Sequence, residues 1–168
     1  MSREIAFLME QTLGSVTHHL NLRRAEALST GYAPRWLPVS FQEGRLPWAV
    51  TSSWAARRSL LAVAGEVDGC FVHTNTIGLM LGDYMRKRPV VVSSDATPLN
   101  KRHMRGAFGL KPESRLAARA KGSLYRRLFQ GAAALVAWSE WAKQSFVEDY
   151  GCRESDVAVP RILFVGGG

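Results

Sequence analysis

Hydroxyl, carboxylate, amide and imidazole side chains follow several apolar segments of this 168-residue sequence, where each segment ends. The sharpest example is segment 88–98, in which three consecutive valines lead directly into Ser93, Ser94, Asp95 and Thr97. An apolar strand that ends in a polar cluster is how open α/β sheets place ligand-binding groups. A strand followed by an ordinary polar loop, with Asp95 as a helix cap, explains the segment equally well.

Similar polar groups follow three other apolar segments. Residues 4–9 precede Glu10, Thr12, Gly14, Ser15, Thr17, His18 and His19, and a third segment ends in His73, Thr74 and Asn75. Ser139 and Glu140 follow a fifth. Because the carboxyl ends of parallel strands meet at one sheet edge, these loops should converge. We therefore predict a site for a polyhydroxylated or phosphorylated ligand that includes Gly14, Ser15, His18, His73, Asn75, Ser94, Asp95 and Thr97.

None of these residues forms a specific catalytic or metal motif. Gly14 and Ser15 at a predicted helix start could bind an anion through free amides, but a plain tight turn is the simpler explanation. The three spaced glycines of a dinucleotide fingerprint and the lysine of a Walker loop are absent. His18 and His19 would diverge by about 100° on a helix, so we predict no metal and no cofactor. His73 either orients a ligand or is a satisfied histidine at a strand end, and the catalytic residues stay unassigned.

Apolar and amphipathic segments alternate along the chain. Strands are expected at 4–9, 32–41, 67–73, 89–93, 133–138 and 156–159, with a further one at 162–165. Helices are expected at 15–29, 52–64, 77–85, 99–107, 112–130 and 139–150. This alternation predicts an α/β fold, a Rossmann-like mainly parallel sheet with helices on both faces. Pro34 and Pro38 indicate that segment 32–41 is either irregular or near a sheet edge.

The helical segments also carry predictions about caps and buried faces. We expect Ser15 or Thr17 to cap the first helix, and Ser52 or Ser53 the second. The expected inward-facing residues are Val16, Leu20, Ala27 and Leu28 in the first helix, Trp54, Leu60, Leu61 and Val63 in the second, and Leu116, Ala120, Leu124 and Leu128 in the fifth.

The chain is basic, with 22 Lys and Arg against 14 Asp and Glu and a net charge of +8. Nine of the cations lie between Lys101 and Arg127, where Glu113 is the only acidic residue. Such a segment forms a solvated face, or binds an anionic membrane surface or nucleic acid. Stacking aromatics are scarce there, so nucleic acid ranks below membrane. No apolar run approaches the roughly 20 residues of a membrane span, so a cytoplasmic location, with a peripheral membrane position as the alternative, is the default.

Three segments, 8–18, 90–98 and 132–141, together resemble the N-terminal domain of family 4 glycosyltransferases. Residues 149–151 followed by 157–159 extend the resemblance, and 161–167 are similar to the first strand of that family's C-terminal domain. The resemblance implies the N-terminal half of a GT-B fold, in which two Rossmann-like domains face each other across a cleft. Residues 1–159 would be the acceptor-binding domain, and 160–168 the start of a truncated donor-binding domain.

The resemblance also implies a reaction: hexosyl transfer from a nucleotide-sugar to a sugar or lipid acceptor, without an obligatory metal. Gly14 would lie near donor phosphate and acceptor, while residues 73–75 and 94–97 would line the acceptor side. Ser94 stands where many relatives have a histidine, and the donor motif is absent. We therefore expect a chain that is inactive alone and needs the missing domain to use a donor. The alternative is a non-catalytic Rossmann-like module that binds anionic ligands or a membrane surface through its basic face.

Overall fold

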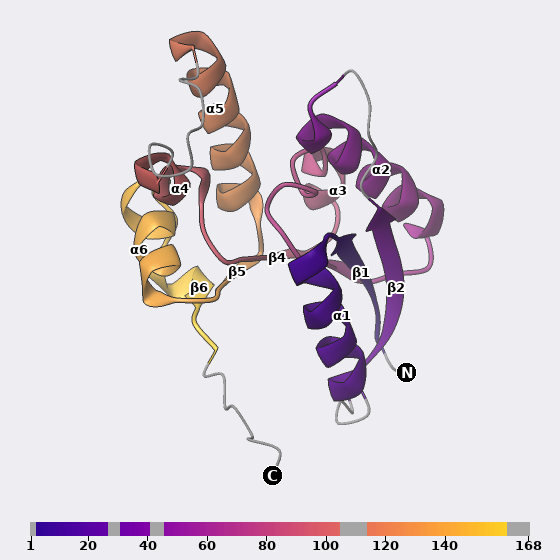
Figure 1. Ribbon diagram of the computed structural model, residues 1–168. Helices are drawn as coiled ribbons and strands as arrows, with labels where there is room; N and C mark the ends of the chain where they lie inside the picture. The colour runs from indigo at the N-terminus through magenta and orange to yellow at the C-terminus, as the bar shows by residue number, and fades with distance from the viewer. Residues whose placement is uncertain (1–2, 27–30, 41–45, 105–113, 161–168) are drawn as a thin grey trace.

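The computed structural model describes residues 3–26, 31–40, 46–104 and 114–160 (Figure 1). Within them, six strands form one sheet in the order β2-β1-β3-β4-β5-β6, and every pairing is parallel. The strands are β1 (Arg3–Gln11), β2 (Tyr32–Ser40), β3 (Gly69–Val72), β4 (Val90–Ser94), β5 (Ala134–Ala137) and β6 (Val157–Ala158). The predicted Rossmann-like α/β fold with a parallel sheet is confirmed. The predicted strand at 162–165 lies outside the described residues.

Helices connect the strands. They are α1 (Leu13–Glu26), α2 (Trp48–Val63), α3 (Gly82–Met85), α4 (Pro98–Met104), α5 (Arg115–Gly131) and α6 (Glu140–Glu148), with a 3-10 turn at Glu154–Asp156. Figure 1 shows α1, α2 and α3 around the half of the sheet that contains β1 and β2, and α4, α5 and α6 around the half that contains β5 and β6.

The direction of chain travel reverses at β1. The chain steps from β1 outward to β2, then returns across β1 to β3, and continues outward in the other direction to β6. Right-handed crossovers therefore put α1 and α2 on opposite faces of the sheet. Such a reversal leaves a crevice outside the carboxyl ends of the two strands that flank it, here β1 and β3.

The two prolines of β2 are explained by its place at the edge. Pro34 lies opposite Ile5 of β1, and Pro38 lies opposite Met9. Proline has no backbone N–H to donate, so a strand that contains two of them is tolerated where one side has no neighbouring strand. The edge position predicted for this segment is confirmed.

Packing differs from the sequence-based expectation in three helices. In α5 the buried residues are Tyr125, Leu128 and Phe129, whereas Leu116 is 80% exposed and Leu124 is 46% exposed. The first turns of α5 extend beyond the other helices (Figure 1), so only its last turns pack. There, Phe129 makes edge-to-face contacts with Phe146 and Tyr150, each at 4.8 Å between ring centroids.

The corresponding corrections in α1 and α2 concern which side chains face inward. Leu60 is fully buried, as expected, but its neighbour Leu61 and the large side chain of Trp54 are exposed. In α1, Val16 and Leu20 are also exposed, and Ala27 and Leu28 lie outside the described residues. A four-residue spacing identifies one face of a helix, and only the sheet decides whether that face is covered.

Helix boundaries also shift. Ser52 and Ser53 are buried inside α2, which begins at Trp48 after Pro47, so neither residue is its cap. The predicted helix at 77–85 is reduced to α3, preceded by turns. Two predictions are confirmed: the Ser139 side chain accepts a hydrogen bond from the Ala142 amide at the start of α6, and Gly151 adopts a positive φ of 69° just after it.

Gly69 at the start of β3 provides a test of how closely the strands approach. A Cβ atom there would lie 3.0 Å from the backbone oxygen of Pro89 and 3.2 Å from its Cγ. We expect Gly69→Ala to lower the free energy of unfolding by roughly 1–3 kcal/mol, because backbone cannot move aside cheaply. Gly65→Ala is the control, since nothing lies within 4 Å of its Cβ position. Urea denaturation that shows equal stability for the two variants would contradict this.

Candidate functional site

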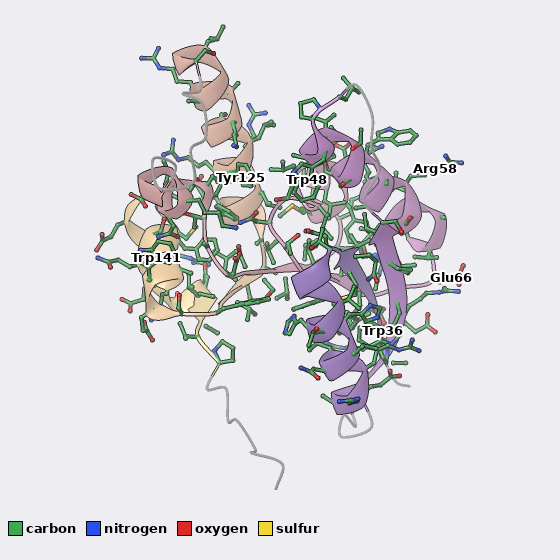
Figure 2. The ribbon with its side chains drawn as sticks, viewed as in Figure 1. Trp36, Trp48, Arg58, Glu66, Tyr125 and Trp141 are labelled. Carbon is green, nitrogen blue, oxygen red and sulfur yellow. The ribbon has the colours of Figure 1, made fainter. Side chains whose placement is uncertain are left out.

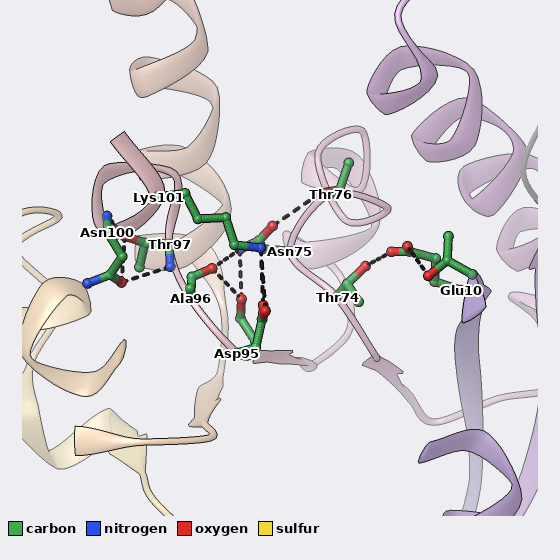
Figure 3. A network of polar contacts seen from close by, with 11 residues as sticks. Glu10, Thr74, Asn75, Thr76, Asp95, Ala96, Thr97, Asn100 and Lys101 are labelled. Atoms are coloured by element: carbon green, nitrogen blue, oxygen red, sulfur yellow. Dashed lines mark hydrogen bonds and ion pairs between the residues drawn. The ribbon is translucent and has the colours of Figure 1, made fainter. Parts of the chain in front are cut away.

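The loops after β1 and β3 are joined by a buried carboxylate. Glu10, the last but one residue of β1, is only 7% exposed. Thr74 Oγ1 donates a hydrogen bond to Glu10 Oε2, and Thr12 Oγ1 donates one to Oε1 at 3.0 Å (Figure 3). Both carboxylate oxygens are thus satisfied, which a buried charge requires. This bridge holds together the two strand ends that flank the chain reversal.

Three aromatic rings meet at the same edge. His18 comes from α1, His73 directly follows β3, and Trp138 directly follows β5. His18 Nδ1 lies 2.5 Å from His73 Nε2, and the ring centroid of His18 is 4.7 Å from that of His73 and 4.6 Å from that of Trp138. Trp138 Nε1 donates to Ser93 Oγ at 2.6 Å, which fixes the indole against the end of β4.

Burial favours the neutral form of both imidazoles by lowering their pKa values. His73 is fully buried, and this desolvation, followed by the nearby His18 and His19, lowers its pKa to about 4. Burial also lowers the pKa of the partly exposed His18. In the bond between them, one nitrogen carries the proton and the other accepts it. His73 Nδ1 is buried with no hydrogen-bond partner among the described residues.

A second group of hydrogen bonds supports the end of β4. Asn75 Nδ2 donates to Ser94 Oγ at 2.7 Å and to the Ala96 carbonyl at 2.8 Å, and Ser94 Oγ donates to the same carbonyl at 2.8 Å. Asn75 and Ser94 are both buried. These two predicted site residues therefore hold the loops after β3 and β4 in place rather than presenting free polar groups.

Thr97 and Asp95 have different surroundings. Thr97 precedes α4 and forms a reciprocal cap with Asn100: its amide donates to Asn100 Oδ1 at 2.9 Å, and the Asn100 amide donates to Thr97 Oγ1 at 3.2 Å. Thr97 Oγ1 also lies 2.6 Å from Ser145 Oγ of α6, so this residue is part of the α4–α6 contact. Asp95 is exposed and lies 3.4 Å from Lys101 Nζ.

The predicted residues thus separate into groups. His18 and His73 converge at the chain reversal. Asn75 and Ser94 hydrogen-bond to each other between the loops after β3 and β4. Gly14 and Ser15 fall inside the first turn of α1 rather than before it. His19 faces another way: it stacks on Trp36 at 5.1 Å, and its Nδ1 lies 3.1 Å from Gln11 Nε2. Figure 2 shows Trp36 beside α1 and β2.

Sequence reasoning missed Trp138 as a site residue and gave Glu10 no place in the predicted set. The available signal for both was position, because each stands at the carboxyl end of a strand, as His73 and Ser94 do. The sequence analysis places Trp138 in the fifth apolar segment and in segment 132–141 of the family resemblance, without a role in a site. A large aromatic residue at the end of such a segment is expected to belong to the hydrophobic core unless it is known which strand ends lie beside it.

Comparison with known proteins establishes the fold. Among solved structures, the chain is similar to Phytolacca americana UGT2 complexed with UDP-2fluoro-glucose and pterostilbene, with a TM-score of 0.60 and 10% sequence identity over 97% of this chain and 54% of that one. It is also similar to the apo form of the same protein, with a TM-score of 0.60 and 9% identity over 99% and 53%. The fold is that of one half of a GT-B protein. No protein-family profile and no curated protein sequence matches the chain.

The chain spans about half the length of the solved structures it resembles. In the described ranges, no three His, Cys, Asp or Glu side chains gather closely enough to hold a metal ion. Over the same part of the chain, none of the helices combines the length and the apolar character needed to cross a bilayer.

The depressed pKa of His73 predicts how stability depends on pH. The folded-state pKa of about 4 lies below the ordinary 6.5, so the unfolded chain binds this proton first. The free energy of unfolding should therefore fall as pH drops from about 6.5 towards 4, by up to roughly 3 kcal/mol at about 1.4 kcal/mol per pH unit. Urea denaturation at pH 7.5, 6 and 5 measures this, and a flat profile would contradict it.

The variant His73→Gln should lose most of this pH dependence, because its side chain does not titrate. His19→Gln is the matched control: it removes a histidine from the same end of the protein but retains His73, so most of the dependence should persist. Direct NMR titration of the His73 ring giving a pKa near 6.5 would show that the ring is solvated rather than buried.

Proposed function

We propose that this chain is the acceptor-binding part of a nucleotide-sugar-dependent glycosyltransferase of family 4 type, and that it transfers sugar only together with a donor-binding half. The single observation that carries the proposal is the pair of imidazoles at the chain reversal, with His18 Nδ1 2.5 Å from His73 Nε2. It lies at the sheet edge where open α/β proteins bind ligands. The likeness to half of a protein whose structure contains UDP-2fluoro-glucose and pterostilbene supports it.

In this proposal His18 is the group that contacts an acceptor hydroxyl. It is partly exposed, whereas His73 behind it is fully buried. His73 holds the His18 ring by the bond between their nitrogens, and Trp138 supplies an aromatic surface beside both. A pKa of about 4 makes His73 a poor proton acceptor at neutral pH, so it suits positioning better than proton abstraction. The catalytic residues stay unassigned.

The adjacent histidines allow a matched test. Octyl β-D-glucoside, which combines sugar hydroxyls with a lipid tail, serves as the acceptor probe below its micelle concentration. Binding is followed by the NMR shift of the Trp138 indole N–H, assigned from Trp138→Phe. We expect His18→Gln to weaken binding about tenfold, the value of one hydrogen bond of roughly 1.4 kcal/mol. His19→Gln should stay within about twofold.

Two results would contradict the proposal. One is an equal loss in both histidine variants, which would mean that the effect is not specific to the ring at the site. The other is a shift confined to residues far from β1, β3 and β5, which would place the glucoside elsewhere.

A second candidate function, binding to an anionic membrane surface, is favoured by the exposed face of α5. Leu116 is 80% exposed and Leu124 is 46% exposed, and the same helix carries the exposed cations Arg119, Lys121, Arg126 and Arg127. Apolar side chains that insert among acyl chains, beside cations that meet lipid phosphates, are typical of helices that lie on membranes. Nucleic acid fits less well, because exposed aromatic side chains for base stacking are not found among these residues.

Vesicle co-sedimentation tests this second candidate. The chain should bind vesicles that contain phosphatidylserine, and high salt should release it because the attraction is screened. Leu116→Ala should weaken binding severalfold, whereas Leu46→Ala, which removes a leucine that is 61% exposed elsewhere, should not. Equal sedimentation with neutral phosphatidylcholine vesicles would argue against it.

A further inference from the structure

A groove lies at the amino ends of the sheet strands, whereas the histidine pair lies at their carboxyl ends. It is formed by the end of α2 and by α3 together with residues 86–88, and has a volume of about 540 Å³. These segments lead into β3, which begins at Gly69, and β4, which begins at Val90, so the groove is at the amino edge. Its size is in the range of small-ligand sites.

The walls of the groove are basic. Arg57, Arg86, Lys87 and Arg88 line it, and Asp83 is its one carboxylate. Asp83 is shared, since Arg57 Nη2 lies 3.4 Å from one of its oxygens and Arg86 pairs with the other. One carboxylate cannot neutralise four cations, so the groove keeps a positive potential.

The two remaining cations, Lys87 and Arg88, make no close ion pair within the described residues. Arg88 Nη1 lies 3.9 Å from Asp68, which does not line the groove. Lys87 is exposed and makes no ion pair within the described residues. Both side chains can therefore turn towards an anion without breaking a strong contact.

The ring of Tyr84 forms part of the groove wall. Tyr84 lines the groove and is only 6% exposed, and its hydroxyl is buried without a hydrogen-bond partner among the described residues. Burial raises the Tyr84 pKa to about 12, so the phenol stays neutral and adds no negative charge beside an anion.

We propose that this groove binds a phosphate-bearing anion, held by Lys87, Arg88 and the shared Arg57 and Arg86. The site is separate from the acceptor edge and does not depend on the proposed glycosyltransferase function. The same phosphate chemistry occurs in a free polyphosphate and in a lipid headgroup, and these sources require separate measurements.

The first measurement is calorimetric titration with inorganic pyrophosphate at physiological salt. Lys87→Gln together with Arg88→Gln should weaken binding at least tenfold. The control is Arg58→Gln with Arg127→Gln, which removes the same charge outside the groove; Figure 2 shows Arg58 pointing outward from α2. The control should stay within about twofold. An equal loss in both double variants would overturn the site, because the effect would then be general electrostatics.

The second measurement uses phosphatidylcholine vesicles that contain phosphatidic acid. One outcome is that the unchanged chain binds these vesicles but not pyrophosphate, and that Lys87→Gln/Arg88→Gln loses the vesicle binding. This outcome identifies a lipid headgroup as the source and supports the site. Binding of neither probe overturns it.

Discussion

The parallel pairing of β1 with both β2 and β3 is the constraint on which the meeting of His18 and His73 depends. Because the chain leaves β1 in one direction and returns past it to β3, the two strand ends lie side by side while their connections diverge. Glu10 then bridges the loops that follow these ends. Without that reversal, residues 18 and 73, which are 55 positions apart, would not share a hydrogen bond.

Burial gives this edge its chemical character. His73 is enclosed between β3, the ring of His18 and the indole of Trp138, so its charged form is disfavoured and it behaves as a neutral polar group. Other polar side chains nearby form hydrogen bonds with each other, namely Asn75 with Ser94 and Thr97 with Asn100. These bonds hold the loops in place, whereas the His18 side chain stays partly exposed.

The positive charge of the chain is divided among separate surfaces. The exposed face of α5 combines cations with leucines, whereas the groove between α2 and α3 combines cations with a buried phenol. The first arrangement suits a broad surface such as a membrane, and the second suits a compact anion. Net charge alone could not distinguish them, because it contains no information about which cations share a cavity.

Alternation of apolar and amphipathic segments was enough to predict the α/β class and the mainly parallel sheet, because side-chain periodicity is a local property. The missing N–H groups of Pro34 and Pro38 likewise indicated a strand that is irregular or near an edge. Position at strand ends also identified His18 and His73 as members of one edge. Only the tertiary structure decided that Trp138 joins them, that Ser94 and Thr97 are used internally, and that Leu116 and Leu61 face outward. Those outcomes depend on which elements pack together, and packing joins residues far apart in the chain.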